Sequence, residues 1–179
     1  MSNWQPRRIG YVNPSYVRIR LPQSDALRRF AEWQGLSEAG PLVPSSSTDA
    51  VALACDEQGE WRGQAVLVSH VQDWTLFEDL TGGLSAVDAT SWQAFAGTDD
   101  LVFAGYNDAI GYGALLIVDR GDIVTNILFD ASAPEDCISV DHRPEGGRSI
   151  QSWTDVAAFV DDDPLAHSDS GVLWVYRPK

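Results

Sequence analysis

Three short segments of this chain concentrate side chains that could carry out chemistry or binding. Asp73–Gly83 runs from aromatic and aliphatic residues into two acids and a pair of glycines. Gly105–Gly113 combines three glycines with tyrosine, asparagine and aspartate, and Asp161–Asp163 is a run of three acids. Carboxylates can bind basic side chains, and tyrosine supplies rigid contact area with a hydroxyl. The candidate partner-binding residues are Glu78, Asp79, Tyr106, Asp108, Tyr112, Asp161, Asp162 and Asp163.

The residues that commonly act in catalysis or metal binding show no recognisable spacing. The histidines (His70, His142 and His167) and the cysteines (Cys55 and Cys137) lie in different segments. They form no paired zinc spacing, and nucleophile-elbow and phosphate-loop motifs are absent from the sequence. We therefore predict no catalytic residues, no metal site and no cofactor. A small carboxylate-based hydrolase is an alternative, because 26 acids provide many pairs, although no spacing selects one.

The charge of the chain is strongly acidic and unevenly distributed. The net charge is −14, from 12 Lys+Arg and 26 Asp+Glu. The first thirty residues carry six arginines and one acid, so the remainder is more acidic than the whole. Such a surface repels nucleic acid and anionic lipid and attracts basic molecules. We expect a basic protein partner and contact with neither nucleic acid nor membrane.

Two further features indicate the compartment. The N-terminus lacks the apolar run of a secretory signal, and no stretch approaches the roughly 18 apolar residues of a membrane span. Cys55 and Cys137 each adjoin apolar residues, so we expect two small buried thiols. The prediction is a cytoplasmic protein.

The elements that must position these segments are mostly strands. Alternating or continuous apolar runs predict about eight strands. Three amphipathic segments, one of them opened by the capping pair Ser152 and Asp155, predict about three helices. Residues 40–49 resemble a loop or linker. The clearest strands are 15–21, 50–55, 64–70, 73–80, 101–106, 114–119, 123–129 and 171–176.

Short connections between successive strands favour an α+β fold with a mainly antiparallel sheet and helices on one face. A chain of 179 residues fits a single domain, 1–179. Within it we distinguish an N-terminal strand, helix and loop over 1–49 from the main sheet region over 50–179. Trp74, Phe77 and Phe103 are expected in the core.

The chain resembles the small acidic immunity proteins of bacterial toxin–immunity systems of the type VI or polymorphic-toxin kind. The resemblance covers roughly residues 50–160 and implies a tight-binding protein partner and no catalysis. The Arg-rich first thirty residues are not part of it. An acidic assembly or chaperone subunit that masks a basic partner is a further alternative. The residues that carry the resemblance are Trp74-Thr75-Leu76-Phe77-Glu78-Asp79-Leu80-Thr81-Gly82-Gly83, Trp92 and Asp100-Leu101-Val102-Phe103-Ala104-Gly105-Tyr106-Asn107-Asp108.

Overall fold

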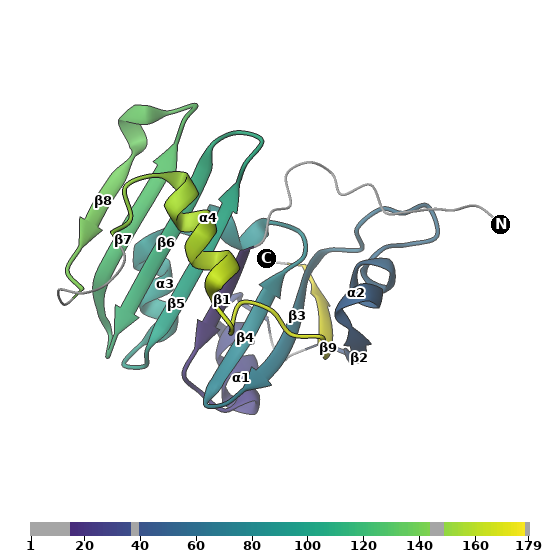
Figure 1. Ribbon diagram of the computed structural model, residues 1–179. Coiled ribbons are helices and arrows are strands. Elements are labelled where there is room, and N and C mark those ends of the chain that lie inside the picture. The colour runs from purple at the N-terminus through teal and green to yellow at the C-terminus, as the bar shows by residue number, and fades with distance from the viewer. Residues whose placement is uncertain (1–14, 37–39, 144–148, 178–179) are drawn as a thin grey trace.

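In the part of the chain that the structure describes, nine strands form one open antiparallel sheet (Figure 1). The computed structural model describes residues 15–36, 40–143 and 149–177. Within them the predicted α+β fold with an antiparallel sheet is confirmed, with one more strand and one more α-helix than expected. The α-helices are α1 (Gln23–Trp33), α2 (Ser47–Ala54), α3 (Ala89–Ala96) and α4 (Trp153–Asp162), with short 3₁₀ turns η1 (Gly83–Ala86) and η2 (Pro134–Asp136).

The strands follow one another in the sheet in the order β2-β9-β3-β4-β1-β5-β6-β7-β8. The first strand therefore lies at the centre of the sheet, where Val17 is opposite Phe77 on one side and Phe103 on the other. The N-terminal strand is thus an integral part of the sheet that the later residues build. The strand bounds are β1 Ser15–Ile19, β2 Leu42–Ser46, β3 Gln64–Val71, β4 Trp74–Asp79, β5 Leu101–Asn107, β6 Tyr112–Asp119, β7 Asp122–Asp130, β8 Ile138–Asp141 and β9 Ser170–Tyr176.

One side of the sheet, here called face A, carries the larger core. Helix α1 has apolar residues at successive turns, including Leu27 and Phe30, and this stripe packs on the central strands. The Phe30 ring stacks on Phe77 with centroids 4.7 Å apart, and Trp92 of α3 stacks on Phe103 at 5.4 Å. Aromatic packing therefore joins α1 and α3 to the middle of the sheet.

The opposite side, face B, is covered by α4 and α2. Val156 and Val160 of α4 are buried against β5 and β6, and Ala50 and Ala54 of α2 are buried against β3 and β9. Figure 1 shows α4 crossing in front of the sheet while α1 and α3 lie behind it. The expectation that the helices share one face was wrong, because adjacent strand residues point to opposite faces and both sets are apolar here.

Residues 40–55 also differ from prediction. The expected loop over 40–49 contains β2, which pairs with β9, and the beginning of α2. The expected strand over 50–55 lies in α2, apart from its last residue. The helix begins after Ser46, whose hydroxyl accepts a hydrogen bond from the Asp49 N–H at 3.2 Å. A short apolar run has no clear period, so it fits a helix as well as a strand.

The predicted core is confirmed for Phe77 and Phe103, which are buried, and wrong for Trp74, which is partly exposed. The thiol prediction is confirmed for Cys55, whereas Cys137 is exposed. In the described part of the chain, no helix has the length and apolar character needed to cross a lipid bilayer.

Candidate protein-binding site at the acidic end of the sheet

The turn that follows β4 is organised by the carboxylate of Asp79. Its oxygens accept backbone N–H groups from Thr81 at 3.1 Å, Gly82 at 2.8 Å and Leu84 at 2.8 Å. Gly82 has φ of 80°, which favours glycine. Burial raises the pKa of the Asp79 carboxyl, and the three N–H donors oppose that rise. Asp79 therefore holds the turn together, and its carboxylate is only slightly exposed to any partner.

The second segment forms the β5–β6 hairpin. The side-chain oxygen of Asn107 accepts the Ala109 N–H at 3.0 Å and closes the turn. Gly111 has φ of 66°, and a Cβ added there would come within 2.9 Å of Ala131 Cβ. The hairpin tip consequently packs against the beginning of the β7–β8 connection, and the Ala131 N–H donates to the Gly111 carbonyl at 3.2 Å.

The β4–η1 turn and the β5–β6 hairpin meet at one end of the sheet and enclose a pocket of about 300 Å³, here the hairpin pocket. A second pocket of about 280 Å³, the groove pocket, lies on face A between α3 and strands β6 to β8. The two share Ser85, Ala86 and Tyr112. Two of the segments singled out from the sequence are thus brought together, with Tyr112 between two cavities.

Tyr106 and Tyr112 both line the hairpin pocket but extend from opposite faces of the sheet. Burial is the main cause that raises the pKa of each phenol; the Asp161 hydrogen bond adds to it for Tyr106 and the Asp130 charge for Tyr112. Ile110 at the hairpin tip is 45% exposed and also lines the pocket. Together they offer apolar area and hydroxyl groups beside acids.

The three acids at the end of α4 have different environments. Asp161 accepts the Tyr106 hydroxyl at 3.1 Å and so lies beside the hairpin. Asp163 accepts the Tyr16 hydroxyl, pairs with the Arg18 guanidinium and accepts the Leu165 N–H at 2.9 Å. Burial alone would raise the pKa of Asp163, but the Arg18 and Tyr16 hydrogen bonds outweigh it and lower the pKa. Asp163 therefore fastens α4 to β1, whereas Asp161 and Asp162 remain at the surface.

The Glu78 carboxylate makes its contacts within the molecule. It contacts His167 Nδ1 at 3.2 Å and accepts the Ser168 N–H at 3.3 Å, in the connection from α4 to β9. The hydrogen bond to Glu78 is the main cause that raises the pKa of His167. Glu78 thus stabilises this connection and presents little free carboxylate.

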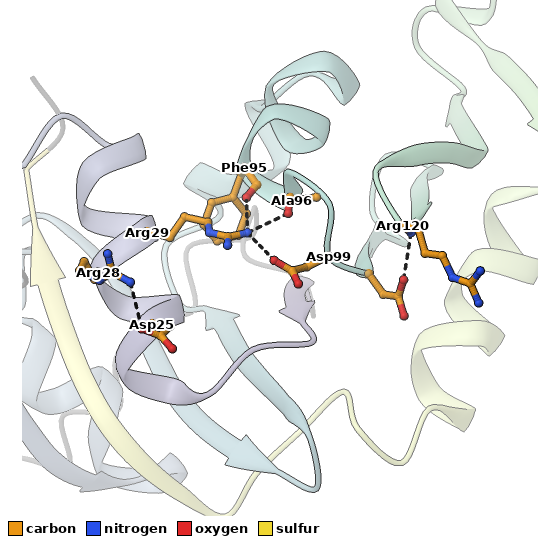
Figure 2. Close-up of polar contacts among 8 residues, drawn as sticks. Asp25, Arg28, Arg29, Phe95, Ala96, Asp99 and Arg120 are labelled. Carbon is orange, nitrogen blue, oxygen red and sulfur yellow. Dashed lines mark hydrogen bonds and ion pairs between the residues drawn. The ribbon is translucent and has the colours of Figure 1, made fainter.

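The described arginines of the N-terminal region are also used internally. Figure 2 shows Arg29 at the C-terminal end of α3, where it donates to the carbonyls of Phe95 and Ala96 and pairs with Asp99. A cation at that end complements the helix dipole. Arg18 pairs with Asp163, and Arg20 pairs with both Asp73 and Asp100. Arg28 pairs with Asp25, as Figure 2 also shows. Arg7 and Arg8 lie outside the described residues.

A group of acids near the two pockets forms no ion pair with any cation of the described residues. Asp108, Glu135 and Asp136 form no ion pair with any described residue, and the Asp130 carboxylate accepts hydrogen bonds from the Ser132 N–H at 2.8 Å and the Ser132 hydroxyl at 2.6 Å. Strand register places Asp130 opposite Tyr112, and Asp161 adjoins Tyr106. The five residues define what we call the acidic end of the sheet: Asp108, Asp130, Glu135, Asp136 and Asp161.

The structure thus divides the residues predicted from the sequence into an exposed group and a group with internal contacts. Tyr106, Asp108, Tyr112 and Asp161 gather at the acidic end, and Asp162 follows Asp161 on α4. Glu78, Asp79 and Asp163 instead make internal contacts. Ile110 was not singled out from the sequence, although its position in a glycine-rich turn indicated exposure. The acids of η2 were not singled out either, because their position depends on how the chain folds between β7 and β8.

Within the described residues, no group of three or more histidine, cysteine or acidic side chains could hold a metal ion. No protein-family model matches the chain, and searches of curated proteins and of solved structures return no match. The acidic end, with its two pockets, is the candidate site that the geometry itself supplies.

Proposed function

We propose that this protein binds a basic protein partner through the acidic end of its sheet and acts as an immunity protein that neutralises a bacterial toxin by occluding its active surface. The observation that carries the proposal is the division of charge. The described N-terminal arginines pair with acids of the same chain, whereas the acids near the two apolar pockets form no ion pair with any described residue. A hydrophobic centre with a charged rim is the usual anatomy of a protein interface.

Each part of this surface has a distinct role in binding. Asp108 and Asp161 attract basic groups over a distance and speed encounter. Tyr106, Tyr112 and Ile110 supply desolvated contact area, which determines how slowly the complex dissociates. Occlusion needs no catalytic group on this protein, and a binding surface of this kind is what the proposal requires.

The same surface is less suited to the hydrolase alternative. Acid–base hydrolysis by carboxylates requires two of them within reach of one substrate. Among the described residues that line the two pockets there is one carboxylate, Asp88, and it accepts the Ser91 N–H at 2.9 Å as the cap of α3. The residues that line the two pockets therefore favour binding of a protein partner over acid–base catalysis.

The test begins with capture of the partner from the native host and measures its affinity for matched variants. Ile110→Ser should weaken binding by about tenfold or more, as expected for an interface anchor. Leu53→Ser is the control, because Leu53 lies on α2 far along the sheet and is 44% exposed, close to the 45% of Ile110. Equal affinity of both variants and the wild type would contradict the proposed surface. Relief of toxicity on co-expression, lost in Ile110→Ser, tests neutralisation.

A further inference from the structure

The edge of the sheet beside the groove pocket is an open strand. β8 is the last strand in the order, and among the described residues none pairs with its outer side. All four of its residues are exposed. At the other edge β2 contains Pro44, which removes a backbone donor, whereas β8 has neither proline nor lysine. Proline at an edge removes a donor that a further strand would need, and β8 keeps all of its backbone donors, so its outer side can pair with another strand.

Strand register shows which groups of β8 are available. The His142 N–H donates to the Val124 carbonyl at 2.7 Å, and the register continues from the pair Thr125 and Asp141. Antiparallel strands alternate between pairs that are hydrogen-bonded to each other and pairs whose backbone groups point away. Ile138 and Val140 are therefore bonded to β7, whereas the N–H and C=O groups of Ser139 face outward.

Beside this edge lies apolar surface. Ile138 and Val140 are opposite Leu128 and Asn126, so their side chains lie on face A, and they are 39% and 40% exposed. Ile138 lines the groove pocket together with Leu128 and Trp92. A strand added to β8 would place every second side chain on this face, next to the pocket.

The charges around the edge indicate what kind of strand fits. Glu135 and Asp136 lie just before Cys137 and β8 and form no ion pair with any described residue, whereas Asp141 at the end of β8 pairs with Arg143. Asp88 lies at the rim of the groove pocket, and its hydrogen bonds with Ser91 lower the pKa of its carboxyl. With a net charge of −14, a second copy of the chain is electrostatically disfavoured here.

We propose that the outer edge of β8 binds an extended basic segment of a partner protein by strand addition, with an apolar side chain of that segment in the groove pocket. The inference rests on the proposed function, because the segment belongs to the same basic partner. The edge adjoins the acidic end through η2, so one partner can occupy both.

The probe is a phage-displayed library of random dodecapeptides, selected on the full-length protein. Enriched peptides should alternate β-branched or aromatic residues with arginine or lysine. They should bind Ser139→Pro about tenfold or more weakly, because proline removes an outward N–H that a strand partner needs. Ser139→Ala keeps that N–H and is the matched control, expected to bind as the wild type does. Ile138→Ser should also weaken binding, and thermal unfolding checks that each variant folds.

Each other outcome overturns the proposal. These are failure to enrich, enriched peptides without basic residues, or equal affinity for Ser139→Pro. A concentration-dependent dimer that Ser139→Pro abolishes would assign the edge to a second copy. Because the selection uses no toxin, its result is separable from the proposed function: Asp108→Asn with Asp161→Asn should weaken the captured partner while leaving peptide affinity unchanged.

Discussion

The ion pair between Asp163 and Arg18 provides a test of what the acids at the end of α4 do. The exposed fractions of the two side chains are 6% and 13%, and Arg18 Nε has no hydrogen-bond partner among the described residues. Replacing Asp163 with asparagine leaves a largely buried guanidinium without its anion. Breaking a buried pair in this way costs about 3–5 kcal/mol. We expect about 3 kcal/mol, since asparagine keeps an acceptor for the Leu165 N–H.

Urea denaturation of the wild type and Asp163→Asn at neutral pH measures this loss. Arg18→Met provides the second side of a double-mutant cycle, and the coupling free energy should be at least about 1 kcal/mol. The pKa of Asp163 lies below its unfolded value, so its stabilisation is complete above about pH 4 and is lost as the pH falls further. The wild type should therefore lose its advantage over Asp163→Asn in acid. A difference in unfolding free energy under about 0.5 kcal/mol at neutral pH would contradict the claim that Asp163 holds α4 to β1. Asp163 would then again be a candidate interface residue.

Two other predictions concern the core and the Glu78 contact. Phe77→Ala should cost about 3–5 kcal/mol in chemical denaturation, because Phe77 is fully buried and stacks on Phe30; a cost near zero would contradict the position of β4. The pKa of His167 should exceed about 6.5 in an NMR titration and return to its ordinary value in Glu78→Gln. Since the folded-state pKa is raised, this contact stabilises the protein at pH below about 6.5 and weakens as the pH rises through that pKa; an unchanged titration in Glu78→Gln would contradict it.

The sequence was most informative where the pattern was long and regular. Leu101–Asn107 and Tyr112–Asp119 are strands close to their predicted limits, because continuous apolar residues joined by a glycine-containing turn fit a hairpin with two covered faces. The capping pair Ser152 and Asp155 also opens α4 as expected, with the Asp155 N–H donating to the Ser152 hydroxyl at 3.3 Å. Ala50–Cys55 was wrongly predicted as a strand because alanine alternates there with valine, leucine and cysteine, so the segment has no polar face.

The site was only partly predictable, for a physical reason. Tyr106, Asp108 and Tyr112 share one hairpin, so their proximity follows from local structure. Asp163 resembles a solvated acid in sequence, and its partner Arg18 is 145 residues away in the chain. Only tertiary structure brings such groups together, and the same holds for the contact of Gly111 at the hairpin tip with Ala131 after β7.

The most direct test of the central claim is the salt dependence of association with the captured partner. Rates are measured from about 50 to 500 mM salt for the wild type, for Asp108→Asn with Asp161→Asn, and for Glu57→Gln, which removes one exposed acid far from the acidic end. The wild-type rate should fall by about tenfold or more over this range. The double variant should associate several-fold more slowly at low salt and converge with the wild type at high salt, while Glu57→Gln follows the wild type. An association rate that does not depend on salt and is the same in the double variant would contradict the claim that the acidic end recognises a basic partner.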